Sequence, residues 1–248
     1  SSYKKKAIET GISEAKGELI ITTDADCIME PQWIKAIVTC YEQDDCKLIA
    51  APVAFCQENN FFKTFQSLDF LTMQGITGAT IQLCIGTMCN GANLAYEKKA
   101  FYLVGGFTGI DCIASGDDML LMYKIYKAYP CGIRFIKNAA AIVKTLPMNT
   151  FRDFMQQRIR WSSKAGKYDD KRITGVLALV YLWNLAFPVL LIAGFFHPIY
   201  WLWFSGLLIY KTIIELFFLL PVAKFFGKKK MLWKFFPAQF LHIPYVLM

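Results

Sequence analysis

Residues 18–27 read ELIITTDADC, an apolar and β-branched run that ends in two aspartates separated by one residue. Gly17 ends a polar helical pattern over residues 3–16, and the run that follows has the composition of a strand. In an extended backbone, residues i and i+2 point to the same side, so we expect Asp24 and Asp26 to face one site. Ligands of open α/β sheets bind beyond the carboxyl ends of the strands, which is where both acids fall.

The two carboxylates suit either of two roles. Hard oxygen ligands favour Mg²⁺ or Mn²⁺, and such an ion would in turn hold phosphate oxygens. The same acids can instead form a turn or cap the helix that Pro31 begins. The DAD pattern alone does not decide between these interpretations.

The segments after this run continue to alternate between helical and strand patterns. We expect helices over residues 3–16, 31–43, 61–83 and 117–129. We expect strands over residues 18–23, 47–55 and 133–145. Residues 86–101 are rich in turn-forming residues. This alternation predicts an α/β fold with an open sheet of parallel character.

The composition changes sharply near residue 172. The whole chain of 248 residues is 55% hydrophobic, and residues 174–196 carry no charge. A second apolar run over residues 199–221 is interrupted only by Lys211 and Glu215. Both runs are long enough to cross a bilayer, and residues 232–248 are expected to form a re-entrant or interfacial helix or to begin a third span.

Lys211 and Glu215 are four residues apart, so we expect them to pair on one face of a helix within a bundle. The alternative is a functional pair, because charges inside a membrane are costly and often serve function.

Basic residues indicate the orientation of the two spans. They flank both runs, at Arg158, Arg160, Lys164, Lys167, Lys171, Arg172, Lys224, Lys228, Lys229 and Lys230. The loop around His197 contains neither Lys nor Arg. The positive-inside rule therefore predicts a hairpin whose two ends lie in the cytosol together with the α/β domain. The same rule explains the net charge of +8, so we expect a lipid bilayer as partner and no nucleic acid.

A second acid pair begins the helix expected at residue 117. Asp117 and Asp118 follow Ser115 and Gly116, and acids at this position can simply satisfy the free N–H groups of the first turn. An aspartate here can instead accept a proton from a hydroxyl group, provided that the hydroxyl lies within hydrogen-bond reach.

The segment before the first apolar run combines aromatic and basic residues. Apolar side chains fall near one helical face, at Phe151, Phe154, Met155 and Ile159. Arg158, Arg160 and Trp161 cluster beside them, which is typical of an interfacial helix held by anionic lipid and a Trp anchor. An Arg can also pair with a diphosphate, and a Trp ring can stack on a sugar, so the two interpretations are compatible.

In this order, ETGISEAKGELIITTDADC, CNGANLAY, VGGF, SGDD and QQRIRW resemble glycosyltransferase family 2. The similarity is to the membrane-bound branch that contains cellulose, chitin and hyaluronan synthases and many bacterial polysaccharide enzymes. It covers roughly residues 3–172 and includes the DxD, acid-pair and QxxRW motifs. The resemblance implies a GT-A-type (Rossmann-like) domain over residues 1–172, which ends in an interfacial QxxRW helix. A membrane region over residues 173–248 follows.

The resemblance also implies roles for the acids. Asp24 and Asp26 would hold a divalent metal, Mg²⁺ or Mn²⁺, and the donor diphosphate, with Asp26 as the more direct metal ligand. Asp118 would deprotonate the acceptor hydroxyl for an inverting single displacement, and Asp117 would support it.

Further roles follow from the same resemblance. Gln157, Arg160 and Trp161 match QxxRW, which closes over the diphosphate and contacts the acceptor side. The segment that borders the acceptor contains Asn90, Gly91 and Asn93. Lys5 or Lys6 would correspond to a basic residue near the nucleotide.

The implied function is transfer of a sugar from a nucleotide sugar, by family preference a UDP-sugar. The acceptor would be a growing polysaccharide or a lipid-linked molecule at the cytosolic face of a bacterial inner (plasma) membrane. Addition of a single sugar to a lipid carrier is the alternative within this chemistry, and no export partner is identified. A non-enzymatic transporter or scaffold is the alternative outside it, and it predicts no metal-dependent nucleotide binding.

Members of family 2 begin with a strand that binds the nucleotide base, followed by another acidic motif. This sequence matches the family only from a later point, so we expect the sheet to be incomplete at its N-terminal side. On that basis the 248 residues alone are expected to be poorly stable and inactive.

Overall fold

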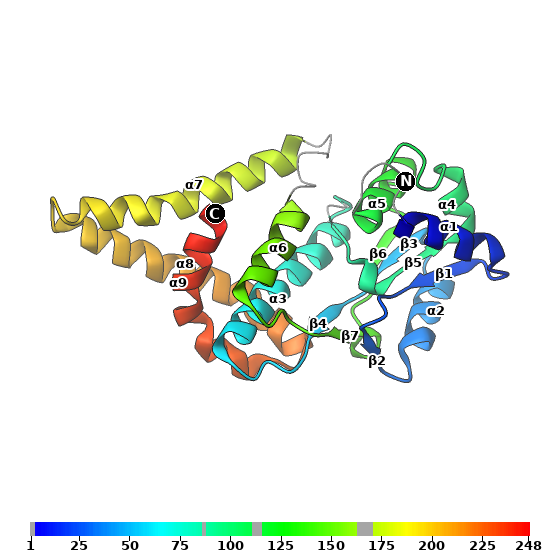
Figure 1. Cartoon of the computed structure of the whole chain (residues 1–248), viewed down its shortest axis with the longest axis horizontal. Coiled ribbons are helices and arrows are strands. Elements are labelled where there is room, and N and C mark those ends of the chain that lie inside the picture. Colours follow the sequence, from blue (N-terminus) through cyan, green and yellow to red (C-terminus); the bar gives the residue numbers. More distant parts are fainter. Residues whose placement is uncertain (1–2, 86–87, 111–115, 163–170) are drawn as a thin grey trace. The chain divides into compact units, whose positions relative to one another are not determined.

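The computed structural model describes residues 3–85, 88–110, 116–162 and 171–248 (Figure 1). The chain divides into two compact units. The first, which we call the α/β unit, comprises Ser1–Gln57 and Met73–Pro147. The second, the helical unit, comprises Glu58–Thr72 and Met148–Met248. This division differs from the change in composition at residue 172, because the segments around residues 65 and 154 share a core with the apolar C-terminal helices.

The α/β unit contains most of the short elements. In chain order they are α1 (Tyr3–Glu14), β1 (Leu19–Thr22), β2 (Ile28–Met29), α2 (Trp33–Gln43), β3 (Leu48–Ala50), β4 (Val53–Phe55), the second part of α3 (Phe61–Gln82), η1 (Gly91–Asn93), β5 (Leu94–Glu97), α4 (Lys98–Leu103), α5 (Asp117–Ala128), β6 (Ile133–Phe135), η2 (Ala139–Ala141) and β7 (Val143–Thr145). The predicted α/β class with open sheets and apolar C-terminal helices is confirmed.

The larger sheet has the strand order β1-β5-β3-β6. Strand β5 is antiparallel to both of its neighbours, whereas β3 and β6 are parallel. The expected parallel character therefore holds for only part of the sheet. The difference arises because Leu94–Glu97, within a stretch that we expected to form turns, makes a buried strand between β1 and β3.

Alternate residues of the larger sheet pack on two different helical layers, as the strand period of two requires. Leu48 and Ala50 join a core with residues of α1, α4 and α5, whereas Ile49 joins a core with residues of α2. Figure 1 shows these helices on opposite faces of the sheet. The larger sheet is thus covered on both sides, and its strand ends form an edge where polar residues can gather.

A smaller sheet has the order β2-β7-β4. The expected strand over residues 47–55 is in fact two strands, β3 and β4, which belong to different sheets. Pro52 stands at the break, and proline lacks the N–H that a ladder requires. The expected strand over residues 133–145 divides in the same way into β6 and β7, with η2 between them.

Asn93 ties these pieces together from the interior. It is fully buried, and its Nδ2 donates to the carbonyl oxygens of Pro52 at 2.8 Å and Ala141 at 2.7 Å. Its Oδ1 accepts from Nε1 of Trp33 at 2.9 Å. One amide side chain therefore connects η1, α2, η2 and the break between the two sheets.

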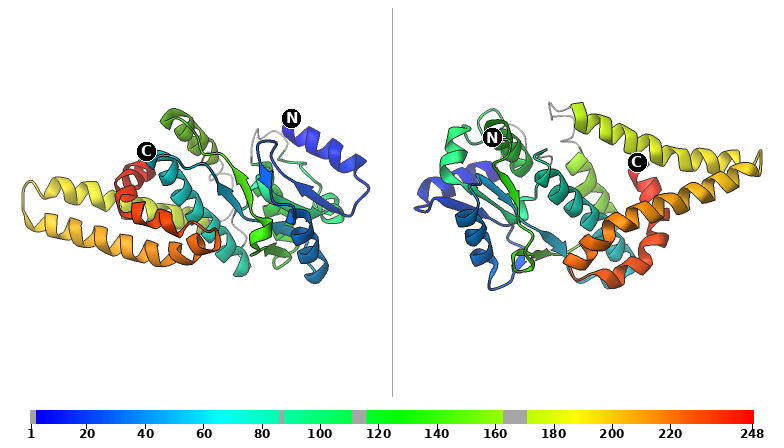
Figure 2. Two further views of the ribbon diagram at one scale, coloured as in Figure 1. Left: turned by 90° about the horizontal axis from the view of Figure 1, so that it is seen from below. Right: turned by 180° about the vertical axis from the view of Figure 1, so that it is seen from behind.

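The helical unit contains the first part of α3 and the later helices. These are α6 (Phe151–Ser162), α7 (Lys171–Ala193), α8 (Ile199–Phe225), η4 (Lys229–Lys234) and α9 (Phe235–Leu247). Thr174–Ala193 and Ile199–Phe225 are long and apolar enough to cross a membrane. Figure 2 shows α7 and α8 side by side as a hairpin.

The core of the helical unit joins α3, α6, α8 and α9. Lys211 on α8 pairs with Glu215 at 2.7 Å and donates to Oε1 of Gln239 on α9 at 2.6 Å. Gln239 in turn donates to Oε2 of Glu215 at 2.6 Å, which closes a ring of three polar side chains. The expected structural pair of Lys211 and Glu215 is confirmed, and α9 supplies its third member.

We predict that Asn93→Ala lowers the free energy of unfolding by about 3 kcal/mol, because it leaves several buried polar groups without partners. Asn138→Ala is the matched control, since Asn138 is exposed and its side chain caps η2 through one hydrogen bond, from the N–H of Ala140. Loss of that cap should cost about 1 kcal/mol. Chemical denaturation of both variants in detergent measures the difference, and equal losses would contradict the central role of Asn93.

Candidate functional site

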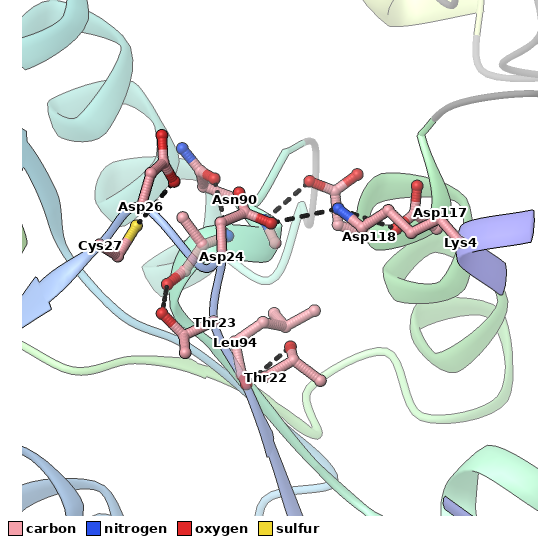
Figure 3. Close-up of polar contacts among 12 residues, drawn as sticks. Lys4, Thr22, Thr23, Asp24, Asp26, Cys27, Asn90, Leu94, Asp117 and Asp118 are labelled. Atoms are coloured by element: carbon pink, nitrogen blue, oxygen red, sulfur yellow. Dashed lines mark hydrogen bonds and ion pairs between the residues drawn. The ribbon is translucent and has the colours of Figure 1, made fainter. Parts of the chain in front are cut away.

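The DAD segment leaves β1 through a turn. The N–H of Cys27 donates to the carbonyl oxygen of Asp24 at 3.2 Å, which closes the turn directly after the strand. Thr23 Oγ1 donates to the carbonyl oxygen of Ala92 at 2.9 Å and fixes the strand end on η1 (Figure 3). Because the backbone turns here, the relation between i and i+2 that holds in an extended chain does not apply.

The two aspartates of this segment consequently meet different neighbours. Asp24 is half-buried, and its Oδ1 lies 3.2 Å from Nζ of Lys4 on α1. Asp26 is exposed, and its Oδ2 accepts from Thr145 Oγ1 on β7 at 3.4 Å. Figure 3 shows the two carboxylates pointing in different directions. A turn replaces the extended backbone on which this expectation was based, and the joint role of the two carboxylates in one site stays a prediction.

The thiol of Cys27 is influenced by the charges of both Asp24 and Asp26. Burial, followed by the negative charges of Asp26 and Asp24, raises the pKa of the Cys27 thiol. The thiol lies 3.8 Å from Oδ1 of Asp26. It therefore stays protonated and can act only as a weak hydrogen-bond donor toward the acids.

Lys4 connects the DAD segment with the acid pair. Its ammonium lies 3.2 Å from Oδ1 of Asp24 and 3.6 Å from Oδ2 of Asp117. Partial burial lowers the pKa of Lys4, but the charges of Asp117 and Asp24 outweigh this effect, and the net result is a raised pKa. Lys4 is thus a charged bridge between two segments that are far apart in the sequence.

Sequence reasoning missed Lys4 and selected its neighbours. Lys5 is buried and donates to the carbonyl oxygen of Ile110, whereas Lys6 is exposed. Three consecutive lysines at the start of a helix point in three directions about 100° apart, and only the packing of α1 decides which one reaches the acids.

The acid pair begins α5 as expected. Gly116 precedes it with φ of 83°, a left-handed conformation that glycine adopts without strain. Oδ1 of Asp118 accepts from the N–H of Met119 at 2.8 Å, and Oδ2 accepts from the N–H of Gly91 at 2.8 Å. A Cβ atom at position 91 would lie 3.3 Å from Oδ2 of Asp118, so glycine allows this close approach.

The segment expected to border the acceptor lies against the acid pair. Oδ1 of Asn90 accepts from the N–H of Ala92 at 3.0 Å and caps η1. Asn93, at the other end of η1, is occupied entirely by interior partners. Asn93 therefore positions the loop, while Asn90 and Gly91 are the partly exposed members of the segment.

Asp117 faces the sheet. It is 9% exposed, and burial together with the charge of Asp117 raises the pKa of Tyr96 on β5. Asp24, Asp117 and Asp118 thus gather where β1 ends and β5 begins, with Lys4 and the N–H of Gly91 between them.

Two of these acids, Asp24 and Asp117, are arranged in a way that suits a hard cation. Oxygens of Asp24 and Asp117 already converge on a single positive charge, that of Lys4. Within the described part of the chain, no group of three or more His, Cys, Asp or Glu side chains is arranged as a ready metal site. The carboxylate pair that faces one cation is therefore Asp24 with Asp117, whereas Asp26 faces Thr145.

The QxxRW residues belong to the helical unit and lie on α6. Arg160 is exposed, and Trp161 is half-buried with its ring centroid 6.2 Å from that of Phe70. Oε1 of Gln157 is buried, and it has no hydrogen-bond partner within the described ranges. Gln157 therefore presents an acceptor oxygen that a ligand hydroxyl can satisfy.

The sequence matches a protein family along nearly its whole length. The family model described as glycosyl transferase family 21 matches residues 2–242. No curated protein matches the chain. The motifs were compared above with family 2 and its cellulose, chitin and hyaluronan synthases, and the match to family 21 corrects that assignment at the level of the family.

We predict that Lys4 stabilises the fold in a pH-dependent way. Its pKa is raised above the usual 10.5, so its contribution is complete below that pH and is lost as the pH rises through the higher folded-state value. Chemical denaturation of the wild type and Lys4→Met between about pH 8 and pH 11.5 should show a stability difference that shrinks with rising pH. A difference that stays constant or grows would show that Lys4 does not bridge the acids.

Proposed function

The chain belongs to glycosyl transferase family 21, and on this basis we propose that it transfers a sugar from a nucleotide-sugar donor to a lipid acceptor at a membrane face. One observation carries the proposal. Asp24 and Asp117 share one positive charge at the end of β1, directly beside Asp118. A site that collects carboxylates around a cation suits a substrate whose leaving group is a diphosphate.

The donor side of the proposed site begins with the acids of the α/β unit. Asp24 and Asp117 would hold a divalent cation, Mg²⁺ or Mn²⁺, with Asp26 available beside them. When bound, such an ion neutralises negative charge on the departing diphosphate. We also propose that Arg160 of the helical unit binds the diphosphate, because a guanidinium pairs with phosphate oxygens through two parallel hydrogen bonds.

Asp118 is the proposed general base. The N–H groups of Met119 and Gly91 orient its carboxylate through one hydrogen bond to each oxygen. Asp118 accepts the proton of the acceptor hydroxyl, and the hydroxyl oxygen attacks the anomeric carbon. The bond from that carbon to the diphosphate oxygen breaks, the nucleoside diphosphate leaves, and the configuration at the carbon inverts.

The acceptor side draws on neutral polar and aromatic groups. Asn90 and Gly91 lie beside Asp118, within reach of the hydroxyl that it would deprotonate. The unpartnered Oε1 of Gln157 can accept a hydrogen bond from a hydroxyl, and the Trp161 ring can stack on the C–H face of a sugar.

A lipid acceptor is favoured over a growing polymer. The apolar hairpin of α7 and α8 supports a position at a bilayer, where a lipid presents its hydroxyl. A polymer synthase must also export its product, and two spans are few for a channel. The main support for a polymer was the resemblance to polysaccharide synthases of family 2, and the chain matches family 21 instead.

We predict metal-dependent release of nucleoside diphosphate by membranes from cells that express the full-length gene product, with one donor from a panel of nucleotide sugars. Asp118→Asn and Asp24→Ala should each lower the rate at least about 100-fold, because they remove the base and a cation ligand. Asp45→Asn is the control, since Asp45 is an exposed carboxylate whose side chain pairs with Lys47. Asp26→Ala should cost less than Asp24→Ala if the cation is held by Asp24 with Asp117.

Release that survives Asp118→Asn and Asp24→Ala would contradict the assigned roles. Absence of release from every donor, with or without Mn²⁺, would instead favour the non-enzymatic transporter or scaffold.

We further predict that the product is a lipid carrying one sugar. Extraction of the reaction into organic solvent, followed by mass spectrometry, should show a single mass increment per lipid. A ladder of increments, or water-soluble polymer, would show that the acceptor is a growing glycan and that transfer is processive.

A further inference from the structure

A buried ion pair lies inside the QxxRW segment of α6. Nη2 of Arg158 is 2.7 Å from Oδ2 of Asp69 on α3, and the two side chains are only 6% and 10% exposed. The sequence predicted that Arg158 would face anionic lipid together with Arg160. The structure instead buries Arg158 and leaves Arg160 exposed, because the two positions lie on different faces of the helix.

The guanidinium of Arg158 also packs between two aromatic rings of its own helix. It lies 4.9 Å from the ring centroid of Phe154 and 4.5 Å from that of Trp161. These residues have the spacing i, i+4 and i+7, so they share the face of α6 that meets α3. The ring of Phe70, the neighbour of Asp69, has its centroid 6.2 Å from that of Trp161.

Asp69 reaches a third helix as well. Nε2 of His242 on α9 lies 4.0 Å from Oδ1 of Asp69. The carboxylate therefore stands at the junction of α3, α6 and α9, between Arg158 and His242. Its ion pair is with Arg158, since the His242 nitrogen lies beyond hydrogen-bond distance.

Such a pair is a costly way to hold a helix in place. Apolar residues of similar volume often stabilise a protein as well as a buried ion pair or better. A directional pair, however, fixes the rotation of a helix, which apolar packing alone leaves less defined. With Arg158 fixed inward, Arg160 lies on the exposed surface of α6 and Gln157 is half-buried.

We propose that Arg158 and Asp69 are positioning residues for glycosyl transfer, which set the rotation of α6 and the orientation of Trp161. The pair acts through Gln157, Arg160 and Trp161 and does not itself contact the substrate. This inference rests on the proposed function. It assigns a role to the first variable position of QxxRW and to a residue of α3 that no motif contains.

The test compares two buried ion pairs of the helical unit. Glu58 pairs with Lys228, and both side chains are 14% exposed, but neither residue belongs to α6. Asp69→Asn should lower kcat at least about 10-fold at saturating donor, because the reacting groups are held less well. Glu58→Gln should change kcat less than about threefold at a comparable loss of thermal stability. Equal effects on kcat, relative to stability, would overturn the proposal.

A readout without catalysis separates this inference from the proposed function. Hydrogen exchange of the backbone amides over residues 151–162 should become faster in Asp69→Asn and stay unchanged in Glu58→Gln. Unchanged exchange in Asp69→Asn would overturn the positioning role even if glycosyl transfer is confirmed. Faster exchange confined to the Asp69 variant would support it even if no donor is found.

Two further variants guard against a general folding defect. Arg158→Lys keeps the charge but lacks the planar group that stacks on Trp161, so it should fold and still lose most of the activity. The double variant Asp69→Arg/Arg158→Asp, in which the two residues are swapped, should regain part of the protection from hydrogen exchange that each single change removes. A fully active Arg158→Lys enzyme would overturn the proposed orientation of Trp161.

Discussion

Carboxylates that gather at the end of one sheet repel one another, and this repulsion has to be offset before the α/β unit can form its site. Like charges a few ångströms apart near a protein surface repel by on the order of 3 kcal/mol. The ammonium of Lys4 faces Asp24 and Asp117 together, and the N–H groups of Met119 and Gly91 face Asp118. Positive charge and N–H dipoles therefore occupy the space between the acids. These contacts stabilise the arrangement of the acids on which the proposed function depends.

The position of these acids follows from the loop that Asn93 anchors. Its amide connects α2, η2 and the break at Pro52, and η1 is thereby held beside the end of β1. Gly91 then meets Asp118 from one side, while Thr23 joins Ala92 from the other. The buried amide of Asn93 thus holds in place the loop on which the position of the acids depends. This explains why a residue expected to touch the acceptor lies in the core.

The sequence predicted the elements whose side-chain pattern is long or sharply bounded. The strand before Asp24 and the helix that begins at Asp117 are where the periodicity and the acids placed them. Strand β5 was missed because its four residues follow turn-forming residues, and only pairing with β1 and β3 makes them a strand. The side chains of Asp24 and Asp26 point in different directions because the backbone turns between them, whereas the i and i+2 relation assumes an extended chain. Tertiary packing decides that Lys4, and not Lys5, reaches the acids. It also decides that Arg158 is buried while Arg160 is exposed. A run of similar residues in the sequence does not contain this information.

The polar groups buried in the helical unit differ in whether their partners are supplied from within. Lys211 has Glu215 and Gln239, Lys228 has Glu58, and Arg158 has Asp69, so each of these charges is matched inside the unit. A buried charge with internal partners gains nothing from a ligand, because binding would first have to break those contacts. The Oε1 atom of Gln157 is in the opposite position, since it is buried and lacks a partner in the described part of the chain. Unpaired buried oxygens are costly, and the cost is removed when a ligand donates a hydrogen bond. On this reasoning Arg158 holds α6 in place, and Gln157, the preceding residue, keeps an acceptor oxygen for the hydrogen bond that the proposed function assigns to it.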